Sequence, residues 1–250
     1  DLDAASLADV KSWFLNKYGP NNAVLVLAGD ISAAEARPLV EKYFAAIPRG
    51  PVNTPAAADV RTLPAAKSIV MKDRVAATSL QRYWAVPGVQ SDQLAALDLG
   101  GSILGGLASS RLDKILVRDE KLAVSVSAGL QPFQRIGIFE VEAVVKPGVD
   151  PALVDKRLNE IMAEYLANGP TDDEVRRAAT QDVAGRIRGL EQVGGFGGKA
   201  VALAEGQVFN GDSIFYKKNL DAYAAVTPAE VRAAMQQWLS RPAFSVRLEP

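Results

Sequence analysis

Residues 122–145 read LAVSVSAGLQPFQRIGIFEVEAVV, and this stretch decides the class of fold. In residues 122–128, apolar side chains alternate with small or polar ones, which is typical of a half-buried β-strand. Residues 136–145 alternate in the same way, and Glu140 and Glu142 share one face because successive strand side chains point to opposite sides. We therefore predict two strands, the second with its glutamates on the solvated side of an antiparallel sheet.

Helix signals surround this pair of strands. Asp150 provides an N-cap, and Pro151 occupies the first helical position, where a missing N–H is tolerated. Two capping-box pairs mark further helix starts, Thr171 with Glu174 and Thr227 with Glu230. The other predicted elements are strands over 68–72, over 78–86 and from Phe244, and helices over 93–104 and 110–118.

The N-terminal part carries its own helix–strand–helix pattern. An amphipathic helix is predicted from Ser6, and the apolar run over 23–28 predicts a short buried strand. Ser32 with Glu35 then caps a second helix. Residues 48–64 contain four prolines and few large apolar side chains, which indicates a linker.

The first thirty residues resemble the last thirty. In both, a capped helix with an apolar face is followed by a proline and an apolar strand, so that Ser6 and Asp9 correspond to Thr227 and Glu230. One interpretation is a tandem duplication in which residues 1–30 are the tail of a preceding domain; the other is chance recurrence of a common unit. If a partner domain is absent, the apolar faces of both N-terminal helices should pack on residues 67–250 or on another copy of the chain.

The composition excludes several classes of chemistry. The 250 residues include no histidine and no cysteine, so a His or Cys zinc site, a Ser-His-Asp triad and a disulfide cannot be built from this chain. The formal net charge of −1 gives no electrostatic reason to bind nucleic acid or an anionic membrane surface. The longest nearly apolar stretch, residues 94–108, is too short to cross a bilayer.

Three candidate motifs have simpler structural explanations. Residues 194–199 are rich in glycine but lack the residues of a phosphate loop, and a predicted helix precedes them where a dinucleotide fingerprint needs a strand. The carboxylates at 172–174 fall in the first turn of a helix, where they complement its dipole. Ser109, Ser110 and Lys114 miss the spacing of a serine–lysine dyad.

Three stretches together resemble the pitrilysin and mitochondrial-processing-peptidase family of zinc peptidases, the inverzincins. They cover most of the chain in the order found in that family. The first comprises Ser6 to Asp30 with residues 40–48; the second comprises Leu104 to Leu112 with residues 116–118 and 125–128; the third is Gly169-Pro170-Thr171 with Glu174.

The resemblance implies a fold and a division into domains. The implied class is α+β, a two-layer domain like those of metalloprocessing peptidases, with a largely antiparallel sheet and helices packed on one face. Residues 1–50 would be the C-terminal segment of a preceding homologous domain, residues 51–66 a linker, and residues 67–250 a complete non-catalytic domain. The family's zinc site is an H-x-x-E-H motif plus a distant glutamate. With no histidine here, we assign neither catalytic residues nor metal ligands and expect zinc in the missing catalytic domain.

Arg118 is the one substrate-binding candidate that the resemblance carries over. The family's inactive halves present an arginine and a tyrosine that hold substrate, and Arg118 matches the arginine by context. However, Val124 stands where the tyrosine is expected. The alternative is a surface arginine at a helix end, paired with a carboxylate.

The implied function is that of a non-catalytic, substrate-enclosing domain of a zinc-dependent metalloendopeptidase, inactive alone. Its partners would be the preceding zinc-binding domain, a second homologous half and a peptide substrate, and the fragment could form a homo-oligomer; no nucleic acid or membrane partner is expected. Alternatives are a structural or assembly subunit with the same fold and an independent enzyme that uses carboxylates. Bacterial members that look like this are often exported, so a periplasmic or exported protein is expected, with a cytoplasmic location as the alternative.

Overall fold

The computed structural model describes residues 2–54 and 59–250. The chain divides into two compact units. One unit comprises residues 1–57 with 186–218, and the other comprises residues 58–185 with 219–250.

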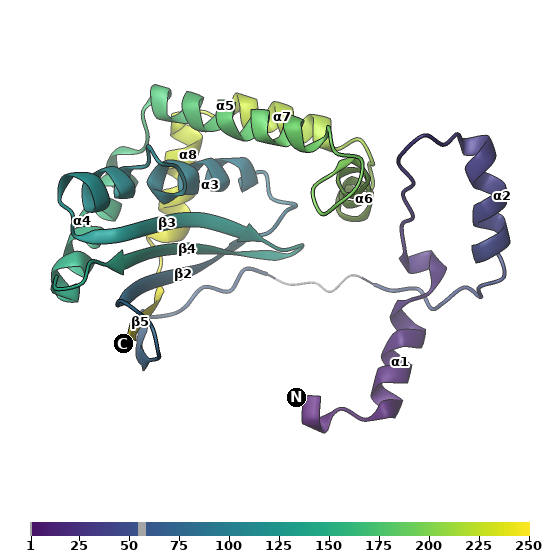
Figure 1. Cartoon of the computed structure of the whole chain (residues 1–250), viewed down its shortest axis with the longest axis horizontal. Helices are drawn as coiled ribbons and strands as arrows, with labels where there is room; N and C mark the ends of the chain where they lie inside the picture. The colour runs from purple at the N-terminus through teal and green to yellow at the C-terminus, as the bar shows by residue number, and fades with distance from the viewer. Residues whose placement is uncertain (1, 55–58) are drawn as a thin grey trace. The chain divides into compact units, whose positions relative to one another are not determined.

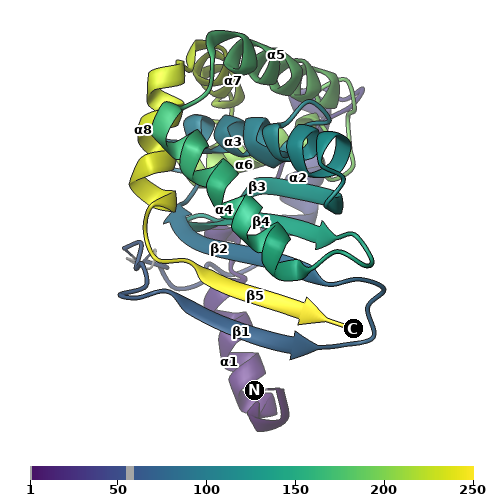
Figure 2. The same cartoon turned by 90° about the vertical axis from the view of Figure 1, so that its left-hand side faces the viewer.

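The second unit contains a five-stranded sheet in the order β1-β5-β2-β4-β3 (Figure 2). Its C-terminal strand pairs parallel with the first strand and antiparallel with the second, whereas the other pairs are antiparallel. The predicted largely antiparallel sheet is thus confirmed. The strands are β1 (Lys67–Lys72), β2 (Ser79–Pro87), β3 (Ala123–Pro132), β4 (Ile136–Val145) and β5 (Phe244–Glu249).

Helices gather on one side of this sheet (Figure 1). Helix α3 (Leu94–Gly101) packs against β3, α4 (Pro151–Asn168) against β4, and α8 (Pro228–Leu239) against β2, α3 and α4. Helix α5 (Asp172–Gly189) follows α4, and α7 (Tyr216–Ala225) precedes α8. This arrangement is the predicted two-layer α+β architecture.

Strand alternation places the core between the two layers. On β2 and β4 every second side chain points toward the helices and is buried, while the side chains between them are half-buried or exposed. Each buried aliphatic or aromatic side chain contributes roughly 2 kcal/mol of hydrophobic stabilisation. The buried strand residues include Leu80, Trp84, Val86, Phe139, Val141, Ala143 and Val145.

Two predicted helices take a wider form than expected. Segments η3 (Ser102–Gly106) and η4 (Asp113–Asp119) are π-helical, with i→i+5 geometry. Glycine is needed where η3 approaches the sheet, because a Cβ on Gly105 would lie 2.7 Å from the backbone nitrogen of Ala128.

The strand predicted over 122–128 begins one residue later and contains an irregularity. The register with β4 shifts between Ala123 and Ser125, which leaves Val124 as an extra residue that is 50% exposed. Simple alternation predicted Val124 to face inward, and the bulge reverses that orientation.

The first unit contains the predicted N-terminal helices α1 (Leu7–Lys17) and α2 (Ala33–Phe44), together with α6 (Lys199–Asn210) and the short turns η1 (Leu2–Ala4) and η2 (Pro20–Asn22). Both capping boxes form, at Ser6 with Asp9 and at Ser32 with Glu35. Residues after α1 are held to residues 50–53, since Asn21 accepts from the Gly50 amide at 2.8 Å.

One expectation for this unit is wrong. Residues 23–28 are not a strand, because no neighbouring strand pairs with them among the described residues. Neither α1 nor α2 has a buried residue, and packing of their apolar faces on residues 67–250 or on another copy of the chain stays a prediction. The predicted linker, residues 51–66, includes residues 55–58, which lie outside the described ranges; its described remainder contains neither helix nor strand.

Candidate functional site

The sheet face opposite the helices is the candidate functional surface. Strand pairing aligns side chains across this face in rows, one of which joins Val246 of β5, Gln81 of β2 and Glu142 of β4. The next row joins Phe244, Tyr83 and Glu140. Polar residues therefore occupy the middle of the face, with apolar residues on β5 beside them.

The middle of the face is held by side-chain hydrogen bonds. The Ser79 hydroxyl donates to Glu142 Oε1 at 2.6 Å, and Gln81 Nε2 donates to the same oxygen at 3.1 Å. The Tyr83 hydroxyl donates to Gln81 Oε1 at 2.9 Å. These bonds run along β2 and across to β4, so the polar groups are fixed by neighbouring strands of a rigid sheet.

The Tyr83 hydroxyl, which donates to Gln81, stays protonated over a wide pH range. Partial burial and the neighbouring carboxylates of Glu140 and Glu142 raise the pKa of its hydroxyl to about 12, because all of them disfavour the phenolate. The group thus stays protonated near neutral pH. Its oxygen can still accept a hydrogen bond, and Gln81 Nε2 has a second N–H, so the two groups can bond a peptide backbone or a polar side chain.

Strand β1 lies at the edge of the same sheet. All six of its residues are exposed, and it pairs with β5 on one side only within the described chain. Its outer edge therefore presents backbone N–H and C=O groups to which an extended peptide can add as a further strand. Ile69 and Met71, which are 41% and 50% exposed, align with the open-face residues Val246 and Leu248.

A groove of about 750 Å³ lies on the other face, between β1, β2, β5 and α4. The buried Arg82 lines it and donates from Nη2 to Asp155 Oδ1 of α4 at 2.6 Å. Burial lowers the pKa of Arg82, and the charge of Asp155 opposes that shift. The ion pair fixes α4 to the sheet, which is sufficient reason for an arginine at a core-facing position.

Arg118, the substrate-binding candidate, lies on η4 and is about half exposed. Its Nε is 2.8 Å from Asp113 Oδ2, and its Nη2 donates to the carbonyl of Ala108 at 2.6 Å. Residues five apart align along a π-helix, which is why Asp113 faces Arg118. The anticipated pairing of Arg118 with a carboxylate is present, and contact with substrate stays a prediction.

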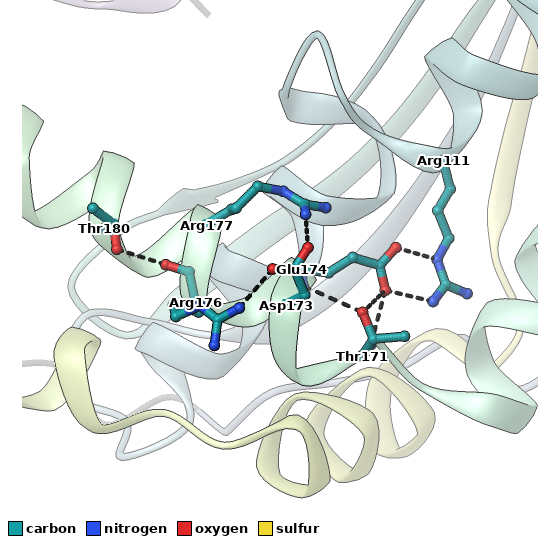
Figure 3. A network of polar contacts seen from close by, with 7 residues as sticks. All are labelled: Arg111, Thr171, Asp173, Glu174, Arg176, Arg177 and Thr180. Atoms are coloured by element: carbon teal, nitrogen blue, oxygen red, sulfur yellow. Dashed lines mark hydrogen bonds and ion pairs between the residues drawn. The ribbon is translucent and has the colours of Figure 1, made fainter.

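A second polar network lies where α5 begins (Figure 3). Arg111 donates to both carboxylate oxygens of Glu174, from Nε at 2.8 Å and from Nη2 at 2.7 Å, and also donates from Nη2 to the Gly169 carbonyl at 3.0 Å. The Thr171 amide donates to Glu174 Oε2 at 2.8 Å, which completes the predicted capping box. The guanidinium lies 4.9 Å from the ring centre of Tyr165.

This network holds the segment before η4 to the start of α5. The bidentate hydrogen bond from Arg111 lowers the pKa of Glu174 to about 2, against a smaller raising effect of burial, and the Thr171 bonds lower it further. The adjacent Asp173 pairs within the same helix, with Arg176 and Arg177. All groups are matched within the network, so its arrangement indicates a structural role.

The family model for the peptidase M16 inactive domain matches residues 4–181, well over half of the chain. The chain belongs to the peptidase M16 inactive domain family. The fold prediction and the recognised family are thereby confirmed.

This M16 inactive domain is similar in sequence to zinc proteases and similar in fold to several solved structures. An uncharacterized zinc protease of Streptomyces coelicolor is 25% identical over 254 residues, which cover 98% of this chain and 54% of that protein. The crystal structure of a protease from Helicobacter pylori matches with a TM-score of 0.83 and 19% identity; the match covers 100% of this chain and 60% of the Helicobacter chain. The crystal structure of a peptidase M16 inactive domain from Pseudomonas fluorescens matches with a TM-score of 0.80 and 25% identity; the match covers 99% of this chain and 58% of the Pseudomonas chain.

The M16 inactive domain spans about half the length of the curated relatives it matches, from 43% to 54%. Its own residues do not fit a zinc site. The sequence has neither histidine nor cysteine, and the described residues contain no group of three or more carboxylates that could hold a metal ion. Within the same described ranges, no helix is long and apolar enough to span a membrane.

The sequence indicated part of the open sheet face described above. It placed Glu140 and Glu142 on the solvated face of β4, which the structure confirms. It missed Gln81 and Tyr83, although both alternate with buried residues of β2 and that pattern could have identified them. It also missed Arg111, because a partner 63 positions away from Glu174 leaves no local signal.

Proposed function

We propose that this chain is a non-catalytic, substrate-enclosing domain of a zinc-dependent metalloendopeptidase. The observation that carries the proposal is the open sheet face, on which fixed polar groups lie beside apolar residues and an exposed edge strand. The chain encloses and orients an extended peptide, while zinc and the attacking water belong to the preceding domain. The fragment alone hydrolyses nothing.

The open face is chemically suited to a peptide rather than to a small ligand. A peptide backbone offers alternating donors and acceptors, which match the Tyr83 hydroxyl and the Gln81 amide. Apolar side chains of the same peptide can contact Ile69 and Met71 on β1. Such a surface binds many sequences weakly, which suits a wall that confines substrate.

Arg118 is proposed as a further substrate contact. Its side chain is 53% exposed, so its remaining guanidinium donors can reach a peptide carbonyl or carboxylate without breaking the pair with Asp113. Replacing it with glutamine should raise KM for peptides and leave the fold intact.

The partners follow from the same proposal. The preceding zinc-binding domain and a second homologous half close around the substrate, and the whole protein is periplasmic or otherwise exported. Fractionation of cells that express the complete gene product tests the location, since recovery in the cytoplasm contradicts export.

The deciding experiment compares the complete gene product with residues 1–250. The complete protein should cleave an unstructured peptide, lose activity with a zinc chelator and regain it with zinc, while the isolated chain stays inert. Robust hydrolysis by the isolated chain contradicts the proposal. A complete protein with no zinc-dependent activity favours the structural or assembly subunit instead.

Variants of the complete protein then test the open face. Tyr83→Phe removes one neutral hydrogen bond and should raise KM about 2–10-fold with kcat unchanged. Arg176→Ala is the control, because that side chain is 71% exposed and pairs only within its own helix. An unchanged KM for Tyr83→Phe counts against peptide binding on this face.

A further inference from the structure

Strand β1, the outermost strand at its end of the sheet, also borders the groove of about 750 Å³ between α4 and the sheet (Figure 2). Strand pairing puts Val70 of β1 beside Arg247 of β5, and Arg247 beside Leu80 of β2. Leu80 is buried beneath the helices, so the side chains of this row lie on the α4 side of the sheet. The groove therefore opens at the outer edge of β1, and Arg247 lies on its floor.

Three positively charged side chains line the groove, and two of them have carboxylate partners on α4. Arg82 donates to Asp155 Oδ1 at 2.6 Å, and Lys156 Nζ lies 4.0 Å from Glu160 Oε1. The third is Arg247, for which the lining residues offer no matching carboxylate. The groove thus has one more positive than negative side chain along its described lining.

The fold leaves most hydrogen-bond donors of Arg247 unused. Its Nε lies 2.7 Å from Glu249 Oε1, but the oxygen is out of line with the N–H, so this buried nitrogen has no hydrogen bond within the described ranges. Buried N–H groups without an acceptor are rare in folded proteins. The side chain is 40% exposed, and its Nη1 and Nη2 likewise have no hydrogen bond among the described residues. These donors are available to a ligand in the groove.

The backbone of β1 directs an added strand toward this row. The Lys67 amide donates to the carbonyl of Ala243, next to β5, at 3.1 Å. Because successive amides of a strand point to opposite sides, those of residues 69 and 71 also point toward β5, and those of residues 68, 70 and 72 point outward. A peptide residue that bonds with Val70 lies directly opposite it, and its side chain points to the same face. That side chain therefore enters the row that contains Arg247.

We propose that Arg247 recognises the carboxylate of a glutamate in a peptide that adds to β1, so that the groove selects for acidic peptides. The inference rests on the proposed binding of an extended peptide by this chain. Neighbouring strands lie about 4.8 Å apart, which puts the added strand about 10 Å from β5. An arginine and a glutamate that lean toward each other over Val70 span this distance. The bond between them is charge-assisted, and the planar guanidinium matches the geometry of a carboxylate.

The neighbouring carboxylates favour this ligand over a more highly charged anion. Glu249 is close to Arg247, and Asp155 and Glu160 line the opposite wall. Their charges repel a phosphate dianion more strongly than a single carboxylate. A glutamate within a bound peptide is also held in place by the backbone hydrogen bonds of the added strand, which a free anion lacks.

The test measures binding of two short extended peptides to residues 1–250 by isothermal titration calorimetry. The peptides differ only in a central glutamate or glutamine, and both ends are blocked, so that the glutamate supplies the only carboxylate. We expect the glutamate peptide to bind about 3–10-fold more tightly at low salt, with a preference that shrinks as salt is added. Arg247→Gln should remove the preference. The matched control is Arg176→Gln, which removes the same charge from a 71% exposed side chain of α5 and should keep it.

Amide hydrogen exchange with saturating glutamate peptide tests the place of binding. The amides of residues 68, 70 and 72 should exchange at least about 10-fold more slowly when the peptide is bound. Those of residues 69 and 71 should not change, because they already bond to β5. Binding without protection of the outward amides overturns the assignment to β1.

The outcomes separate this inference from the proposed function. Equal affinity for the two peptides, or a preference that survives Arg247→Gln, overturns the role of Arg247 and leaves peptide binding by the chain intact. If neither peptide binds, both the inference and the proposed peptide-binding function fail. Loss of the preference in Arg176→Gln as well would attribute it to net charge and also overturn the inference.

Discussion

Residues 6–28 and residues 227–249 show how one local pattern behaves in two environments. Both segments begin with a capping box and continue as a helix with an apolar face. In residues 227–249 that face is buried and the residues after the helix form β5. In residues 6–28 the face is exposed, and residues 23–28 form no strand. The difference teaches that caps and helices are decided locally, whereas a strand exists only where neighbouring strands supply its hydrogen bonds.

The largest expected effect tests the contrast in burial. Val231→Asp puts a charge at a position that is 0% exposed and should reduce the free energy of unfolding by about 4 kcal/mol or more. Val10→Asp, at the corresponding exposed position, should change it by less than about 0.5 kcal/mol. Urea titration of both variants of residues 1–250 makes the comparison. Similar losses would contradict the contrast in burial between the two helices.

The next effect separates capping boxes that act locally from one with a tertiary partner. Glu174 bonds with Arg111, while Asp9 and Glu230 bond only with their own caps. Because the pKa of Glu174 falls from its ordinary 4.5 to about 2 on folding, its stabilisation is present above pH 4.5 and lost as pH falls toward 2.

Glu174→Gln should therefore reduce stability by about 2 kcal/mol at pH 7 and flatten the loss of stability between pH 4.5 and 2. Chemical unfolding at several pH values measures both. Asp172→Asn, in the same helix turn, is the control. An unchanged pH profile in Glu174→Gln contradicts the assigned role of the Arg111 pair.

A third prediction concerns the close packing of α8 against α3. Gly100→Ala forces Met235 to move, since the new Cβ would meet Sδ at 2.7 Å, and should cost about 1–3 kcal/mol. Gly185→Ala in α5 has open space around it and should be neutral or stabilise by up to about 1 kcal/mol. Thermal unfolding of the two variants compares them. If both behave alike, the close approach of α3 and α8 is not limiting.

The smallest effect compares the two caps. Thr227→Ala should lower the free energy of unfolding by about 1 kcal/mol, because α8 is part of the core and its cap bond contributes to the cooperative transition. Ser6→Ala removes the same bond from α1 and should only reduce helix content, since α1 buries no residue. Circular dichroism and urea titration distinguish the outcomes. An equal loss of global stability in the two variants would contradict the contrast between residues 6–28 and residues 227–249.

Much of the fold could be predicted because its signals are local. Caps at Thr171 and Thr227 define where helices begin, and alternation over 136–145 gives β4 with its two faces correctly assigned. The candidate surface was predictable only in its β4 half. Gln81 and Tyr83 complete it through pairing with β4, a partnership that depends on register between strands.

Other features depend on contacts that no local pattern encodes. The bulge at Val124 arises from pairing with β4, and the wide turns of η3 and η4 arise where helical segments meet β3. Arg111 stabilises Glu174 from the segment before η4, far away in sequence.

The sequence by itself determined the helices with their caps, the alternating strands, the internal likeness of residues 6–28 to residues 227–249, and the absence of any zinc ligand of the His or Cys type. Only the tertiary structure decided which of the two similar helix–strand segments is buried, that β5 lies between β1 and β2, and which polar residues meet on the open face of the sheet. The reason is physical. A cap bond closes within four residues, whereas strand pairing and burial need surfaces brought together by the rest of a domain.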